Sequence, residues 1–129
     1  MEKFELLPLF NIEGISAASG LVFNDNKLYI ISDSSSYLYE YDIAAEKLNK
    51  IALVENAQEN IVKKDKPDFE SITLKDEKLL LLGSGSTATR NSMIVFDLKS
   101  NEVTVQSLAA IYSQIKSEHS IKDSELNIE

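Results

Sequence analysis

The feature that most constrains the fold is an internal repeat. Residues 20–34, GLVFNDNKLYIISDS, match residues 71–85, SITLKDEKLLLLGSG, at an offset of 51 positions without a gap. Each segment has a short apolar strand, a polar turn, a lysine, a strongly apolar strand and a loop of small residues. Farther along, residues 39–43 match residues 94–98 at an offset of 55, because four residues are inserted within 86–91. Two copies of one supersecondary unit are therefore expected.

Each copy is predicted to form a four-stranded antiparallel sheet, from period-two or continuous apolar patterns with turn residues between them. The expected strands are 19–23, 27–32, 37–42 and 47–53 in the first copy, and 70–74, 78–83, 93–97 and 102–108 in the second. Asp42 and Asp97 stand where the turn between the third and fourth strands needs a self-capping side chain. The expected fold class is all-β, with two tandem four-stranded antiparallel blades of the β-propeller type that form a partial propeller.

A shorter pattern, an asparagine or aspartate followed by an apolar residue and a glutamate, predicts where the copies begin. It occurs at residues 11–13, 68–70 and 127–129. The single domain, 1–129, is accordingly divided into a first repeat at about 11–54, a linker at 55–66, a second repeat at 67–108, a helix and linker at 109–125 and the start of a third repeat at 126–129. Because a propeller needs more blades than two, we expect either a homo-oligomer or further blades after this segment.

One short helix is predicted near residues 107–116. Leu108, Ile111, Tyr112 and Ile115 recur at the spacing of one helical face. The segment that follows is polar and is expected to be a loop, which also contains His119, the only histidine. No serine or carboxylate lies at a spacing that suggests a catalytic triad with His119, so this side chain is expected to be exposed.

Composition excludes several classes of partner and chemistry. The chain has 13 lysine and arginine residues against 21 aspartate and glutamate residues, a net charge of -8, which disfavours nucleic acid as a partner. It has no cysteine, so disulfides and zinc thiolate sites are excluded. No apolar run is long enough for a membrane span. Met1 to Phe10 lack the apolar core of a secretory signal, which predicts a cytoplasmic protein, or a periplasmic or extracellular one if a signal was removed.

Candidate functional residues gather in loops that are expected at one end of the two blades. The candidate ligand-binding residues are Asp33, Asp68, Glu70, Ser84 and Arg90, with Asp68 and Glu70 as candidate metal ligands. Carboxylates and hydroxyls are oxygen ligands of the kind that calcium takes, and Arg90 could hold an anion through two parallel hydrogen bonds. The plainer interpretation is a flexible loop at 83–91, in which Arg90 has a surface or salt-bridging role.

The segments DFESI at 68–72 and LLLLGSG at 79–85 carry a family resemblance. With them, the chain resembles the phytase-like, or esterase-like, bacterial β-propeller families from about residue 11 onward. The resemblance implies channel-facing acids at Asp68, Glu70 and Glu129, with Glu13 as a fourth. It also implies that active relatives are calcium-dependent phosphoesterases whose site lies at one mouth of the central channel.

Three functions stay open at this point. The preferred one is a non-catalytic propeller-type repeat module that binds a partner or small ligand through its loop-rich face, with no catalytic residue assigned. The second is a calcium-dependent, phytase-like phosphoric ester hydrolase, with Asp33, Asp68 and Glu70 as calcium ligands and Arg90 on the phosphate. The third is a truncated propeller fragment without a function of its own.

Overall fold

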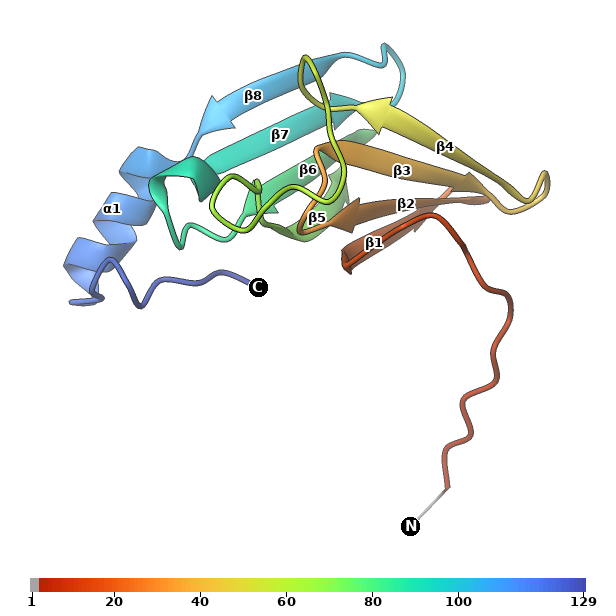
Figure 1. Cartoon of the computed structure of the whole chain (residues 1–129), viewed down its shortest axis with the longest axis horizontal. Coiled ribbons are helices and arrows are strands. Elements are labelled where there is room, and N and C mark those ends of the chain that lie inside the picture. The colour runs from red at the N-terminus through yellow and green to blue at the C-terminus, as the bar shows by residue number, and fades with distance from the viewer. Residues whose placement is uncertain (1–2) are drawn as a thin grey trace.

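Two four-stranded antiparallel sheets and one α-helix make up the computed structural model, which describes residues 3–129 (Figure 1). The first sheet contains β1 (Ala18–Asn24), β2 (Lys27–Ser32), β3 (Tyr37–Asp42) and β4 (Lys47–Ala52), and the second contains β5 (Phe69–Lys75), β6 (Lys78–Gly83), β7 (Ser92–Asp97) and β8 (Val103–Ser107). Within each sheet the strands follow chain order. All the strand bounds lie within one residue of those expected from the repeat, and the all-β class with two such sheets and a short helix is confirmed.

The first hairpin of each sheet closes through a tight two-residue turn. Both turn residues have positive φ, at 48° and 60° for Asp25 and Asn26 and at 49° and 59° for Asp76 and Glu77. Two successive residues of this conformation are typical of a type I′ turn, whose twist matches that of the flanking strands. The polar turns of the repeat therefore set the register of both hairpins.

The hairpin between the third and fourth strands is capped by an aspartate in each sheet. Oδ1 of Asp42 accepts a hydrogen bond from the N–H of Ala45 at 2.9 Å, and Oδ1 of Asp97 accepts one from the N–H of Ser100 at 3.0 Å. The predicted self-capping role of both aspartates is confirmed.

Both sheets begin with a β-bulge. The pairing of β1 with β2 shifts between Ala18 and Gly20, and the pairing of β5 with β6 shifts between Phe69 and Ser71. Ser19 and Glu70 are therefore the extra residues, at the same place in the two sheets. A bulge locally bends its strand and redirects a side chain.

The bulges correct the predicted start of the first copy. The structural counterpart of residues 68–70 is 17–19, at the offset of 51, and not 11–13. Ala17 and Asp68 also share a positive φ, at 49° and 55°. The three-residue pattern was misleading because strand pairing and tight turns, not short motifs, determine the register. The equivalent bulges show that the offset of 51 continues back to residues 17–19.

The hydrophobic core lies between the two sheets. Its buried members are Tyr29, Ile31, Leu38 and Leu53 on one side, and Phe69, Leu79, Leu81, Ile94 and Phe96 on the other. The sheets approach each other chiefly through their first strands, β1 and β5. The opposite edges are the outer strands β4 and β8.

The helix α1 (Ala109–Glu118) starts two residues later than predicted. Leu108 and Tyr112 are buried together with Leu126, but Ile111 is 55% exposed. The predicted apolar face is thus only partly covered, because α1 packs on the end of the second sheet and not between two layers. Within residues 3–129, no helix has both the length and the apolar character of a membrane span.

Candidate functional site

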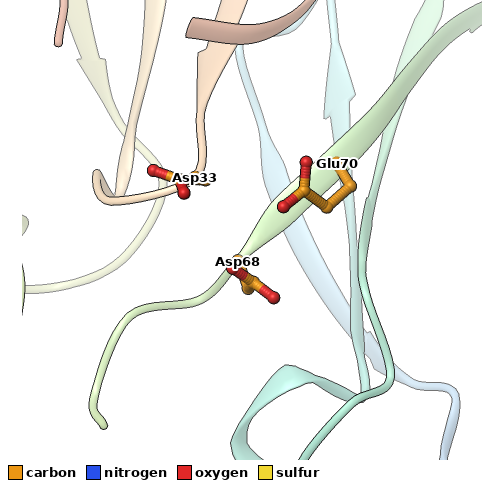
Figure 2. Close-up of side chains that lie close together, drawn as sticks. All are labelled: Asp33, Asp68 and Glu70. Carbon is orange, nitrogen blue, oxygen red and sulfur yellow. The ribbon is translucent and has the colours of Figure 1, made fainter. Parts of the chain in front are cut away.

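Side chains from separate loops meet at one end of the sheets. Asp33 follows β2, Asp68 precedes β5, and Glu70 is the bulge residue of β5 (Figure 2). One carboxylate oxygen from each of the three lies within 4.8 Å of the others. Ser84 and Arg90, the other two candidates from the sequence, both contact Asp68. With Lys66, these residues form what we call the polar cluster: Asp33, Lys66, Asp68, Glu70, Ser84 and Arg90.

Asp68 is the centre of the polar cluster and is only 5% exposed. Its Oδ2 accepts a hydrogen bond from Ser84 Oγ at 2.6 Å and lies 3.1 Å from Arg90 Nη1, while its Oδ1 lies 2.7 Å from Lys66 Nζ. Burial alone would raise the pKa of Asp68, but the hydrogen bonds from Lys66 and Ser84 outweigh burial and lower it. The Asp68 carboxylate is therefore held in its charged form.

Lys66 is the residue that sequence reasoning missed. Its Nζ donates to Asp33 Oδ2 at 2.5 Å and also lies 2.7 Å from Asp68 Oδ1, so one ammonium joins two carboxylates. Burial would lower the pKa of Lys66, but its hydrogen bonds to Asp33 and Asp68 raise it instead. One indication of this role was present in the sequence: Lys66 directly precedes Pro67 and Asp68 and therefore lies near the start of β5.

Arg90 is buried, and both terminal nitrogens of its guanidinium have partners within the protein, whereas its Nε has none among residues 3–129. Nη1 donates to Ser86 Oγ at 2.7 Å and Nη2 donates to the carbonyl oxygen of Lys63 at 2.7 Å, in addition to the ion pair with Asp68. Of the surface or salt-bridging role considered from the sequence, the salt bridge is present, and only the surface position is wrong. Arg90 ends the short 3₁₀ helix η1 (Ala88–Arg90), which was not predicted, and its side chain is only 10% exposed.

Within residues 3–129, Asp33 and Asp68 have hydrogen-bond and ion-pair partners, but no such partner is found for the carboxylate of Glu70. Burial is the main cause of a raised pKa for Glu70, and the negative charges of Asp68 and Asp33 raise it further. At the same bulge position in β1, Ser19 donates its Oγ to the carbonyl oxygen of Phe69 at 2.5 Å. Ser19 thus forms a hydrogen bond to the second sheet, whereas the equivalent residue Glu70 has a carboxylate without a donor.

The geometry is accompanied by one family match. Residues 14–129 match a model described as "Family of unknown function (DUF6929)". The chain belongs to the DUF6929 family. No curated protein and no solved structure shows a significant match to it. The DUF6929 match includes both sheets, α1 and the whole polar cluster, and it begins after Glu13.

The other acids and the histidine proposed from the sequence lie in different places in this DUF6929 protein. Glu129 is close enough for its charge to contribute to the raised pKa of Glu70. Glu13 is exposed and lines a separate depression with Phe10 and Leu21. His119 is exposed and ends α1, as expected from its polar surroundings.

The charges of the DUF6929 polar cluster do not balance. Lys66 and Arg90 supply two positive charges against the three carboxylates of Asp33, Asp68 and Glu70. The hydroxyl of Ser84 is fully buried and already donates to Asp68. The arrangement can therefore accept one further cationic or hydrogen-bonding group, and Glu70 is the acceptor placed to receive it.

Proposed function

We propose that the chain is a non-catalytic, propeller-type repeat module whose loop-rich face binds a cationic group of a partner or small ligand at Glu70. The observation that carries this proposal is the unpaired Glu70 carboxylate beside the internally paired Asp33 and Asp68. A half-buried acceptor without a partner gains a charge-assisted hydrogen bond when a donor arrives. The net charge of -8 also attracts cations to the surface.

The equivalence of successive segments supports the propeller-type assignment. The N–H of Asp68 donates to Asp33 O at 3.1 Å, where the chain enters the second sheet, and the N–H of Ile128 donates to Ser84 O at 2.8 Å. Residues 126–129 therefore lie beside the end of β6 in the same way that the start of β5 lies beside the end of β2. The first strand of a third repeat would begin at this position. The resemblance to the phytase-like, or esterase-like, bacterial propellers agrees with this assignment.

Assembly with a second copy or with further blades is part of the proposal. Phe4, Leu6 and Leu9 are 91%, 96% and 91% exposed, and Leu21 and Phe23 on β1 are each 60% exposed. The first three lie in the extended segment before β1, and exposed apolar side chains in such number normally mark an interaction surface. Packing of blades between chains would cover them.

A calcium-dependent phosphoesterase is the second candidate, because three carboxylate oxygens lie within 4.8 Å of one another. Calcium takes oxygen ligands of this type. However, the Lys66 ammonium lies between Asp33 and Asp68, and the Arg90 guanidinium already donates to the carbonyl oxygen of Lys63. Calcium would have to displace Lys66, and phosphate would have to recruit a different cation.

Two peptides separate binding of a cationic group from nonspecific contact. Acetyl-Gly-Arg-Gly-amide and its citrulline analogue have nearly the same shape, but only the arginine peptide is charged. We expect the arginine peptide to shift the amide resonances around Glu70 at millimolar concentration and the citrulline peptide to leave them unchanged. Glu70→Gln should abolish the shifts, whereas Glu55→Gln, at an exposed linker position, should not. Equal shifts from both peptides, or shifts that survive Glu70→Gln, would contradict the proposal.

Calcium tests the second candidate directly. The thermal midpoint and the hydrolysis of p-nitrophenyl phosphate are measured with and without calcium. We expect neither to respond in the wild type. A calcium-dependent rise in both, lost in Asp33→Asn and Glu70→Gln, would favour the phosphoesterase instead.

A further inference from the structure

We infer that the linker between the two sheets encloses a second binding site, which takes a compact apolar group carrying a primary amine. The site is a cavity of about 380 Å³ between the linker and the second sheet. Its apolar wall includes Val54, Ile61, Phe69, Ile94 and Val105. None of these residues belongs to the polar cluster, so this site is separate from the one proposed at Glu70.

The cavity exists because of how the sheets meet. They approach closely at β1 and β5, where the first strands pack. The chain crosses from the end of β4 to the start of β5 (Figure 1). Val54, Ile61 and Pro67 of this crossing segment form one wall of the cavity. Phe69 and Ile94, only 3% and 2% exposed, form the floor. The cavity therefore results from the way in which the two sheets and the segment between them pack together.

The linker wall is fixed by hydrogen bonds to the first sheet. The N–H of Gln58 donates to Ser36 Oγ at 2.8 Å, and the N–H of Ser36 donates to the carbonyl oxygen of Gln58 at 3.0 Å. The hydroxyl of Tyr37 donates to the carbonyl oxygen of Ala57 at 3.0 Å. A wall held in this way does not have to be ordered when a ligand binds, which favours affinity.

Size and lining determine the apolar part of the ligand. Small-molecule pockets are about 300–1,000 Å³ and are mainly apolar, with a few polar groups that orient the ligand. This cavity is at the small end of that range, so its ligand is a single ring or a branched aliphatic group. Val105, which is 56% exposed, lines the solvent-accessible side of the cavity.

Charge determines the polar part. Asp65 is the only charged residue among the described residues that line the cavity. Its contact with a base is a 4.0 Å pair with Lys64, in which both side chains are largely exposed. Pairs of this kind contribute little, so the Asp65 carboxylate can receive a ligand ammonium at the rim.

Benzylamine, benzyl alcohol and benzoate are suitable probes, because they share a ring and differ in charge. We expect benzylamine to bind in the millimolar range, about fivefold more tightly than benzyl alcohol, which is the upper end for an exposed ion pair. Benzoate should bind least. Amide shifts in a nitrogen-15 titration should centre on residues 54–65, 89–94 and 105.

Matched variants make the test specific. Val105→Trp should fill the cavity and weaken benzylamine at least tenfold, while Thr104→Trp, on the same strand but the opposite face, should not. Asp65→Asn should remove the preference for the amine over the alcohol, and Asp76→Asn, in a distant turn, should keep it. Absence of shifts at residues 54–65 and 105, equal binding of benzoate, or binding that survives Val105→Trp would overturn the inference.

Discussion

The ammonium nitrogen of Lys66 lies 2.7 Å from Oδ1 of Asp68, a carboxylate that is almost completely buried. The same nitrogen also reaches Asp33 at the end of β2. One side chain from the linker thereby connects the first sheet to the start of the second. The contact is both an ion pair and a joint between the two repeats.

Replacing Lys66 should weaken the fold. Lys66→Met leaves Asp33 and Asp68 without their shared cation, and removal of one member of a buried ion pair costs about 3–5 kcal/mol. We expect a loss near the low end, about 3 kcal/mol, since Arg90 still pairs with Asp68. Urea unfolding measures the change. Lys64→Met, at a largely exposed lysine, is the control and should change the free energy of unfolding by less than about 0.5 kcal/mol.

Glu70→Gln should change the dependence of stability on pH. Burial and the neighbouring carboxylates raise the pKa of Glu70 in the folded state. A group with a raised folded pKa contributes stability below its unfolded pKa, near 4.3, and that contribution is lost as the pH rises through the folded pKa. The variant should therefore gain stability relative to wild type between about pH 4 and pH 7. Urea unfolding at both pH values tests this expectation, and a difference that stays constant would contradict it.

The contribution of Asp68 to stability depends on pH in the opposite direction from that of Glu70 and in a lower pH range. Its folded pKa is lowered, so its contribution is present at neutral pH and is lost only as the pH falls through that lowered value. The two carboxylates can therefore be distinguished in one titration. Glu55→Gln serves as the control for both, because Glu55 is exposed.

Gly83→Ala should be poorly tolerated. A Cβ at Gly83 would lie 2.5 Å from the carbonyl oxygen of Arg90 and 3.2 Å from that of Pro67. Both are backbone atoms, so the chain must move, and overpacking of this kind costs about 1–3 kcal/mol. At Gly20 the nearest atoms, at 3.1 Å and beyond, belong to side chains, so Gly20→Ala should cost less. Thermal unfolding of the two variants should rank them in this order.

The exposed apolar segment before β1 should contribute to self-association. We expect the wild type to have a mass above the 14.4 kDa of one chain by light scattering coupled to size exclusion. Changing both Phe4 and Leu6 to serine should raise the dissociation constant by at least about a hundredfold, because burying two large apolar side chains contributes about 3 kcal/mol or more. Changing Lys3 and Glu5 to serine, in the same segment, is the control. A well-folded wild-type monomer would show that the segment is not an interface in this chain.

The strands could be predicted closely because each is bracketed by a tight polar turn, as at Asp25 and Asp76, and because the pattern occurs twice. The nearness of Asp33 to Asp68 and Glu70 also followed from the repeat, since loops at one end of successive sheets must meet. Lys66 could not be identified in the same way. Its partners are 33 positions before it and two after it, and a lysine in a polar linker has the same local pattern whether it is solvated or buried.

The two outer edges of the molecule differ in how well they resist the addition of another chain. On β4, Lys47 and Lys50 place charges along the edge, whereas β8, Val103–Ser107, contains no charged residue. Charged side chains on an edge strand discourage a second strand from pairing there. An uncharged, half-apolar edge leaves its backbone groups open to such pairing. During overexpression or concentration, ordered aggregation of this protein would therefore start at β8, and a lysine at Thr104 would be the change to suppress it.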